Sequence, residues 1–245
     1  MIKLRASIKK HLPWWLIKFY YFVKFFFLGF LFSSNLTKLA QLFGTDKWGA
    51  HYYTQHYQHH FSSYKFKKIR LLEIGVGGYA DPHSGGQSLR MWKKYFPFAK
   101  IFAIDIYDKK NLQEKRIKIF QGSQVDEQFL INVVRESGEL DIIIDDGSHI
   151  NEHVIKSFEV LFPHLKDGGI YVIEDLETSY RDDYGGDSKD LENPKTSMNF
   201  FKSLADKINS KEYRTSGTQE TIYDSHVYAI HFYHNLIIIE KRSSE

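Results

Sequence analysis

Short apolar runs alternate with amphipathic stretches along most of this chain, from residue 69 onward. The runs are rich in Ile, Val and Leu, as is typical of strands buried on both faces. They are RLLEIG (70–75), KIFAID (100–105), RIKIF (116–120), DIIID (141–145) and YVIED (171–175). The stretches between them carry apolar residues at helical spacing. Strands that alternate with helices predict an α/β fold with right-handed βαβ units, a mostly parallel sheet and helices on both faces.

The pattern changes towards the C-terminus. An amphipathic helix with Met198, Phe201 and Leu204 on one face is followed by SHVYAIHFYHNLIIIEK (225–241). That segment predicts two strands joined by a tight turn at His234 and Asn235, which adds an antiparallel pair to the sheet. Further back, the helix after DIIIDDGSHI has Asn151 as its expected N-cap. We find no domain boundary after residue 69.

The first 34 residues follow another pattern, in which aromatic residues crowd together and every interrupting charge is basic. A membrane-spanning helix needs about 20 predominantly apolar residues, and Lys18 and Lys24 interrupt this run. A signal peptide is disfavoured because the uninterrupted run 25–32 is short and no small-residue cleavage site follows. Two interpretations stay open for this arm (1–34): a helix that lies in a membrane interface through residues 13–32, or a helix that packs on the domain or on a second subunit.

Residues 35–68 predict a helical lid region, and residues 69–245 the main domain. The lid region contains four histidines, at positions 51, 56, 59 and 60. A metal site there is disfavoured, because only His56 and His60 share a helix face and no carboxylate accompanies them. A lid over a neighbouring pocket is the favoured interpretation.

Composition narrows the function classes. The chain has 245 residues, 42% of them hydrophobic, which suits one packed domain of roughly 200 residues plus an appendage. Since there is no cysteine, disulfides, thiolate metal sites and a cysteine nucleophile are excluded. The net charge of +3 is too balanced to indicate a nucleic-acid partner. Any metal must therefore use oxygen or imidazole ligands.

A glycine-rich loop follows the first strand in LLEIGVGGYADPHSGGQSLRMW. Two features disfavour a nicotinamide cofactor: the helix cannot begin before Gly86, and Asp105 lies 30 residues after Gly75, where about 20 are expected. Glu73, Gly75 and Gly77 instead match the E-x-G-x-G pattern typical of class I S-adenosylmethionine methyltransferases. Glycines let the backbone approach the ligand, and Asp105 at the end of the second strand can accept both ribose hydroxyls.

Acidic residues end two consecutive strands of the predicted sheet. Asp145 and Asp146 follow the first, and Glu174 and Asp175 end the second. Neither motif contains a compensating base, so we expect Asp146, Glu174 and Asp175 to share a divalent cation such as Mg²⁺. His149, three residues beyond Asp146, is the candidate general base, because an imidazole with an ordinary pKa of about 6.5 accepts a proton near neutral pH. Asp145 is left without a role, helix capping being one interpretation.

Several motifs together resemble the metal-dependent sugar O-methyltransferases of the mycinamicin and macrocin type. They are GTDKWGAHYYTQHYQHHF, LLEIGVGGY, GGQSLRMWKKYFP, DIIIDDGSH and YVIEDLETSY, in this order between Leu36 and Tyr180. The resemblance implies a Rossmann-like class I methyltransferase fold, with Mg²⁺ on Asp146, Glu174 and Asp175 and His149 as the base. It also implies contacts to S-adenosylmethionine from the residues Glu73, Gly75, Gly77, Tyr79, Ser88, Asp105, Ser123, Gln124 and Asp146.

These observations predict a metal-dependent O-methyltransferase that acts on a hydroxyl of a sugar or of a glycosylated small molecule. The aromatic arm stands where the macrolide enzymes have a long N-terminal domain, which favours a membrane-bound or lipid-linked sugar. We expect a cytoplasmic protein, at the inner face of the membrane if the arm binds lipid, and a homo-oligomer stays open. The alternative from another class is a membrane-associated scaffold that binds the cofactor or metal without catalysis.

Overall fold

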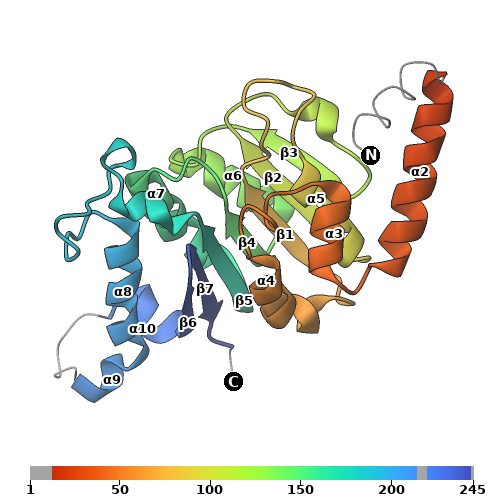
Figure 1. The fold of residues 1–245 in the computed structure, drawn as a ribbon. Coiled ribbons are helices and arrows are strands. Elements are labelled where there is room, and N and C mark those ends of the chain that lie inside the picture. Colours follow the sequence, from red (N-terminus) through yellow and green to blue (C-terminus); the bar gives the residue numbers. More distant parts are fainter. Residues whose placement is uncertain (1–12, 214–219, 244–245) are drawn as a thin grey trace.

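The computed structural model describes residues 13–213 and 220–243, and its centre is a single twisted sheet (Figure 1). The sheet has the strand order β3-β2-β1-β4-β5-β7-β6. Its strands are β1 (Arg70–Ile74), β2 (Lys100–Asp105), β3 (Ile117–Gln121), β4 (Leu140–Asp145), β5 (Leu165–Glu174), β6 (Val227–Tyr233) and β7 (Leu236–Lys241). The first five strands pair in parallel, and β7 pairs antiparallel with both β5 and β6. The predicted fold class is confirmed.

Helices cover both faces of the sheet because successive strand residues point to opposite sides. Leu71 faces a core cluster with α3, α4 and α5, whereas Leu72 faces a cluster with α6, α7 and α8. The helices are α2 (Trp14–Leu31), α3 (Leu36–Phe43), α4 (Thr54–Phe61), α5 (Gln87–Tyr95), α6 (Glu127–Ser137), α7 (Asn151–Leu161), α8 (Ser197–Ile208), α9 (Ser210–Tyr213) and α10 (Ile222–His226). Short 3₁₀ turns are η1 (Ser62–Tyr64), η2 (Lys110–Leu112), η3 (Phe162–His164), η4 (Leu176–Tyr180) and η5 (Asp182–Tyr184).

The strand order reverses at β1, which has β2 on one side and β4 on the other. Ile74, the last residue of β1, is in register with Ile104 of β2 and with Asp145 of β4. The loops that leave β1 and β4 therefore run to opposite faces of the sheet, and a crevice opens between them. In open α/β sheets, ligands bind in this crevice at the carboxyl ends of the strands.

The C-terminal strand pair forms as predicted, and its turn contains Asn235 at φ +57°, a conformation that Asn tolerates better than most residues. The predicted N-cap role of Asn151 is wrong. Ile150 is the N-cap of α7, and Asn151 is the first helical residue. Its side chain donates to the carbonyl oxygens of Thr178 (3.1 Å) and Tyr184 (2.9 Å) and accepts from the backbone N–H of Ser197 (2.7 Å). Asn151 thus fastens the long polar loop to α7 rather than capping the helix.

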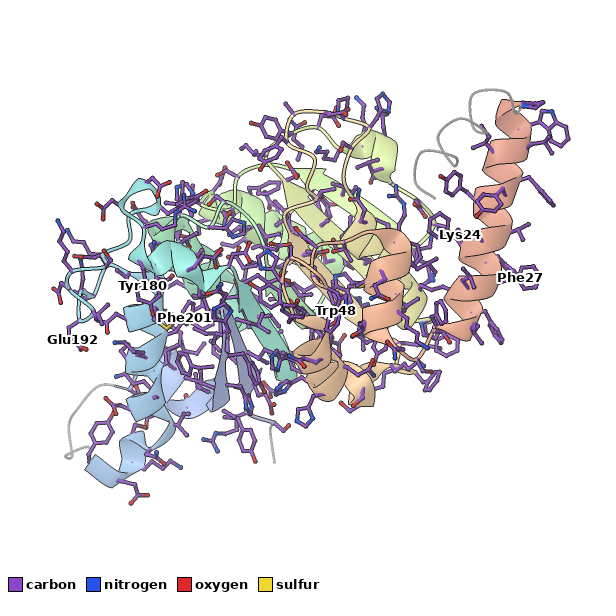
Figure 2. The ribbon with its side chains drawn as sticks, in the orientation of Figure 1. Lys24, Phe27, Trp48, Tyr180, Glu192 and Phe201 are labelled. Carbon is purple, nitrogen blue, oxygen red and sulfur yellow. The ribbon has the colours of Figure 1, made fainter. Side chains whose placement is uncertain are left out.

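Helix α2 lies at one side of the molecule (Figure 1). Several of its aromatic side chains are exposed to solvent. Phe25 stacks on Phe43 of α3, with ring centroids 5.2 Å apart, while Phe27 points away from the domain (Figure 2). The first 12 residues of the predicted arm lie outside the described residues. Among the described helices, none combines the length and the apolar character that crossing a membrane requires.

Candidate functional site

A cavity of about 840 Å³ opens at the carboxyl ends of β1, β2 and β4. It lies at the strand reversal, where the fold predicts a ligand. Ten of the predicted site residues line it: Gly75, Gly77, Tyr79, Ser88, Asp105, Ser123, Gln124, Asp146, His149 and Asp175. The other two, Glu73 and Glu174, are buried behind its wall. The structure therefore brings the predicted residues to one place and divides them into an inner and an outer set.

The glycine loop forms the floor of the cavity, and Gly75 shows why glycine is needed there. Its φ is +96°, and a Cβ at this position would overlap the backbone carbonyl oxygen of Asp146. The close approach holds the ends of β1 and β4 together. Helix α5 begins only at Gln87, after Gly86 at φ +73°, so the helix does not open at the first glycines. The N-terminus of α5 is therefore not at the first glycines, where a nicotinamide cofactor would need it to bind the pyrophosphate.

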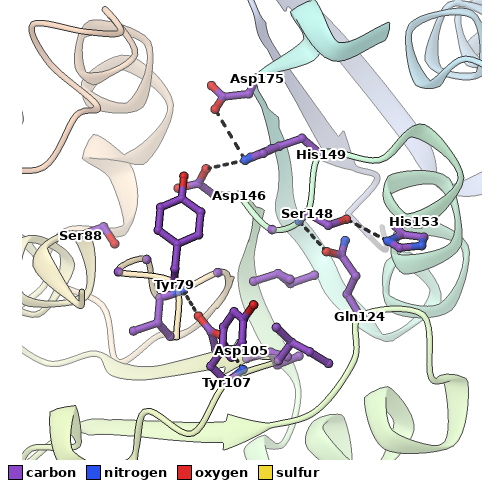
Figure 3. A pocket seen from close by; sticks show the side chains of 18 of the residues that line it. Tyr79, Ser88, Asp105, Tyr107, Gln124, Asp146, Ser148, His149, His153 and Asp175 are labelled. Carbon is purple, nitrogen blue, oxygen red and sulfur yellow. Dashed lines mark hydrogen bonds and ion pairs between the residues drawn. The ribbon is translucent and has the colours of Figure 1, made fainter. Parts of the chain in front are cut away.

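Asp105 ends β2 with its carboxylate held by the backbone. Oδ2 accepts from the N–H of Val76 (3.0 Å), and Oδ1 accepts from the N–H of Tyr107 (2.9 Å). Each oxygen keeps a further lone pair, so the carboxylate is oriented and can still accept from a ligand in the cavity. Tyr79 lies at the mouth with 87% of its surface exposed (Figure 3).

Gln124 connects the cavity wall to Asp145, the acid without a predicted role. The Gln124 amide donates to Asp145 Oδ1 (3.3 Å), and its carbonyl accepts from the N–H of Ser148 (2.8 Å). Asp145 is 1% exposed and also accepts from Ser157 Oγ. Burial raises the pKa of Asp145 to about 6. Asp145 is therefore a buried acid that does not line the cavity. The side chain of Gln124 lines the cavity and is also hydrogen-bonded within the protein through both its nitrogen and its oxygen.

Asp146, His149 and Asp175 converge on the cavity (Figure 3). His149 Nε2 lies 3.7 Å from Asp175 Oδ2 and 4.0 Å from Asp146 Oδ1. Both His149 (φ +58°) and Asp175 (φ +56°) adopt left-handed backbone conformations, which are uncommon for residues with side chains. The fold holds these two residues in strained conformations at the place where their side chains meet, a feature that often marks a functional site.

Two residues of the lid region fix Asp175 from the other side. The hydroxyl of Tyr53 donates to Asp175 Oδ1 (2.7 Å), and His51 Nδ1 lies 3.5 Å from the same oxygen. The rings of His51 and Tyr53 stack with centroids 4.9 Å apart. Asp175 therefore has one oxygen held by Tyr53, and its other oxygen faces His149.

A buried lysine occupies the inner set of carboxylates. Lys47 Nζ lies 2.5 Å from Glu174 Oε1, 2.7 Å from Asp146 Oδ2 and 3.2 Å from Glu73 Oε1. Glu174 Oε1 also accepts from the hydroxyl of Tyr57, and Glu73 Oε2 accepts from Ser88 Oγ (2.9 Å). Neither acidic motif contains a base, as the sequence shows, but Lys47 supplies a positive charge from a distant segment.

One ammonium does not balance three carboxylates. Burial lowers the pKa of Lys47, but the charges of Asp146, Glu174 and Glu73 outweigh burial and hold that pKa well above its usual value. Burial and the charge of Asp146 raise the pKa of Glu174 as well. The shift of Lys47 reflects the surrounding negative charge, whereas that of Glu174 is due first to burial and then to the charge of Asp146. Nearby negative charge favours the uptake of a further proton or cation. The cluster is therefore suited to bind a cation beyond the one it carries.

The donor atoms fit a divalent ion on the outer side of the cluster. One ligand atom each from Asp146, His149 and Asp175 lie within 4.8 Å of one another, and all three residues are partly exposed. The corresponding atoms of Glu73, Asp146 and Glu174 enclose Lys47. Oxygen donors suit Mg²⁺, which usually keeps several waters. Asp146 and Asp175 face the open side, whereas Glu174 faces Lys47 with its Oε1.

Sequence reasoning missed Lys47, Tyr53 and Tyr57. They lie in the segment 45–57 and contact the carboxylates, while Thr45 and Asp46 of the same segment line the cavity. Their partners are remote in the chain: 99 residues separate Lys47 from Asp146, and 127 separate it from Glu174. The one signal was a lone basic residue within GTDKWG, between a helix and a tyrosine-rich stretch.

Comparison with known proteins gives consistent relatives, although no protein-family model matches the chain. The chain is 45% identical over 211 residues to the mycinamicin VI 2''-O-methyltransferase of Micromonospora griseorubida. It is 46% identical over 211 residues to the demethylmacrocin O-methyltransferase of Streptomyces fradiae. Each match covers 85% of this chain and 53% of the relative, so the chain spans about half the length of these relatives.

Solved structures agree. The mycinamycin-pathway methyltransferase MycE, in a complex with Mg, SAH and mycinamycin VI, superimposes with a TM-score of 0.82 at 45% identity. The match covers 85% of this chain and 54% of that one. The alternative of a scaffold without catalysis finds no support among relatives that are all named as methyltransferases. The chain is a homologue of the mycinamicin- and macrocin-type sugar O-methyltransferases and has their class I methyltransferase fold.

Proposed function

We propose that this chain transfers a methyl group from S-adenosylmethionine to a sugar hydroxyl in a Mg²⁺-dependent reaction. The observation that carries the proposal is the convergence of the glycine loop, Asp105 and the group Asp146, His149 and Asp175 on one cavity. The names of the relatives support the same reaction class. The proposal also divides the chain into three regions: the arm (1–34), the lid region (35–68) and the methyltransferase domain (69–245).

The cofactor side of the cavity is assigned to the loops after β1, β2 and β3. Gly75 and Gly77 leave room for the ligand to approach the backbone, and Asp105 accepts from the ribose hydroxyls. Ser123 and Gln124 border the adenine side, and Tyr79 closes the mouth. Glu73 does not line the cavity, but its carboxylate accepts a hydrogen bond from Ser88 and so orients that side chain.

The metal side is assigned to the ends of β4 and β5, with Mg²⁺ on Asp146 and Asp175 and with Glu174 as the third ligand. The support is that Asp146 belongs to two groups of donor atoms, one with His149 and Asp175 and one with Glu73 and Glu174. Lys47 already binds two of these carboxylates, so it fixes their orientation and limits how far they can move toward the ion.

The chemistry requires a positioned base and an activated acceptor. Bound S-adenosylmethionine would supply the electrophilic methyl group, and bound Mg²⁺ would lower the pKa of an acceptor hydroxyl. His149 Nε2 then accepts the hydroxyl proton. Asp175 Oδ2, 3.7 Å from Nε2, stabilises the imidazolium that results.

The acceptor is assigned as a glycosylated small molecule or a lipid-linked sugar. One of the relatives is named for mycinamicin VI, and MycE was solved with mycinamycin VI bound. Tyr184 lines the cavity from the polar loop after β5, and Asn151 anchors that loop. The loop residues from 180 to 194 are therefore the segment in which acceptor preference would be encoded.

The function is tested by transfer of labelled methyl groups. The chain is incubated with Mg²⁺, S-adenosylmethionine carrying a labelled methyl group, and a panel of glycosylated macrolides, free sugars and lipid-linked sugars. Incorporation of label into a sugar hydroxyl supports the proposal. If the cofactor binds by calorimetry but every acceptor stays unlabelled, the sugar assignment is wrong; if the cofactor does not bind, the whole proposal fails.

We also propose that α2 rests in a membrane interface, with the protein at the inner face of the membrane. The support is its row of exposed aromatic residues, among them Trp15, Phe19, Phe27 and Phe30, with exposed fractions of 61–77%. Such residues on a solvated helix favour burial in lipid. Flotation with phosphatidylglycerol vesicles should be lost in the Phe27→Glu, Phe30→Glu variant. Equal flotation of both proteins, or self-association in solution without flotation, would overturn this part.

A further inference from the structure

Two histidines and a glutamate from distant segments meet outside the cavity described above. His60 lies on α4, His231 on β6 and Glu240 on β7. His60 Nδ1 is 3.1 Å from Glu240 Oε1, and His231 Nε2 is 3.2 Å from the same oxygen. One donor atom from each residue lies within 4.8 Å of the others. None of the three lines the cavity.

These separations suit a transition-metal ion. Zinc binds imidazole nitrogen and carboxylate oxygen at about 2.0–2.2 Å in tetrahedral geometry, which places neighbouring ligand atoms about 3.3 Å apart. The two nitrogen–oxygen distances at Glu240 are close to that value without rearrangement. Two imidazoles and one carboxylate leave a fourth position for water, and His231 and Glu240 are both about one-third exposed.

The ring of His60 is held in place by its neighbours. Its side chain is buried, and Nδ1 is the nitrogen that faces Glu240. On the far side of the ring, His60 Nε2 lies 3.0 Å from the hydroxyl of Tyr233. Metal-binding histidines almost always have such a partner on the second nitrogen, because it fixes the orientation of the ring.

We propose that His60, His231 and Glu240 form a second metal site, separate from the Mg²⁺ site, that binds Zn²⁺ or a similar divalent transition metal. Two nitrogen donors distinguish this site from the Mg²⁺ site, which is assigned to the carboxylates of Asp146, Glu174 and Asp175. The histidine-rich segment 51–60 thus contributes one ligand, and the carboxylate that the segment lacks comes from β7.

The site would act as a clamp between α4 and the C-terminal strand pair. Helix α4 also carries Tyr57, which donates to Glu174, and it follows Tyr53, which donates to Asp175. A metal ion at His60 would therefore fix the helix that orients two of the carboxylates in the cavity. This inference does not depend on methyl transfer, so the two can fail separately.

The test uses the untagged full chain with a His149→Gln change, which removes the imidazole that lies between Asp146 and Asp175. Zn²⁺ alone is titrated by competition with a chromogenic chelator. We expect one tight site per chain, and His231→Gln or Glu240→Gln should each weaken it at least about tenfold. Tyr233→Phe should weaken it about tenfold through loss of ring orientation. His234→Gln, an exposed histidine in the same hairpin, is the matched control and should bind as tightly as the parent.

Thermal unfolding gives an independent measurement. At a free Zn²⁺ concentration 100 times the dissociation constant, the unfolding midpoint of the parent should rise by about 5 °C, and that of His231→Gln should not. Because His231 and Glu240 are partly exposed, these variants are expected to fold. Zn²⁺ affinity that is unchanged by either substitution, or no uptake of Zn²⁺ by the parent at micromolar concentrations, would overturn the proposal.

Discussion

Lys47 Nζ lies 2.7 Å from Asp146 Oδ2, although 99 residues separate the two in the chain. The same ammonium contacts Glu73 in β1 and Glu174 at the end of β5. One fully buried charge from the segment before α4 therefore ties together the carboxyl-end residues of three neighbouring strands. Asp146 belongs to both carboxylate sets, so the position of Lys47 also determines the position of the candidate metal ligand.

Replacing Lys47 by Met should destabilise the protein strongly. Removing one partner of a buried ion pair leaves uncompensated charge, which costs about 3–5 kcal/mol of unfolding free energy. Urea denaturation at pH 7 measures this loss. Added Mg²⁺ should restore part of it in Lys47→Met, because the cation then offsets acids that no longer have an ammonium.

Lys118→Met is the matched control for that substitution. Lys118 pairs with Glu136 on the surface, where an ion pair contributes about 1 kcal/mol or less. If both variants unfold at the same urea concentration, Lys47 does not hold the carboxylates as described.

Gly75→Ala should be more harmful than an alanine at an ordinary left-handed glycine. The new Cβ meets the carbonyl oxygen of Asp146, so the ends of β1 and β4 must separate. We expect a loss of about 3 kcal/mol or more in unfolding free energy, together with weaker cofactor binding. Gly185 has φ +72° and open space around it, so Gly185→Ala should cost only about 1 kcal/mol. Equal losses in the two variants would show that backbone strain alone, and not the contact with Asp146, explains the need for glycine.

The sheet could be predicted from the sequence because each buried strand is recognisable from its own residues. Buried strands read as apolar runs, and the pairing of β4 with β5 places Asp146 and Asp175 at one edge without knowledge of any contact. The late start of α5 was also predictable, because Gly85 and Gly86 cannot continue a helix easily.

The rest depends on contacts between remote segments. Lys47 reads as an ordinary loop base until the fold buries it among carboxylates 26, 99 and 127 residues away. Asn151 reads as a helix cap, yet its amide binds the loop between β5 and α8. His60 has no carboxylate nearby in sequence and meets Glu240 only because α4 packs against the sheet. The sequence pattern around each of these residues does not indicate partners that are distant in the chain.

We predict that Glu114, which lies outside the cavity, makes the free energy of unfolding depend on pH. Burial raises the pKa of Glu114, but hydrogen bonds from Lys93 and Arg90, each 2.6 Å long, outweigh burial and lower it. The folded state therefore favours the ionised form. Its contribution is fully present above the unfolded pKa of about 4.3 and is lost as the pH falls through the lower folded value.

Glu114→Gln should accordingly cost about 1 kcal/mol at pH 7 and progressively less as the pH falls from about 5 to 2. Denaturant unfolding of both proteins across this range measures the difference. Arg90 also donates to the carbonyl oxygen of Gly85, so the variant should loosen the glycine loop slightly. A stability difference that grows as the pH falls would contradict the assigned direction of the shift.

The most direct measurement is the rate of methyl transfer by wild type, by His149→Ala and by wild type in EDTA, at pH 7.5 with saturating S-adenosylmethionine and acceptor. Removing the base should lower kcat by about 10²–10⁴-fold. EDTA should abolish transfer, and excess Mg²⁺ should restore it, whereas the exposed His164→Ala variant should match wild type. A wild-type rate in His149→Ala, or full activity in EDTA, would contradict the assignment of His149 and Mg²⁺ to the reaction.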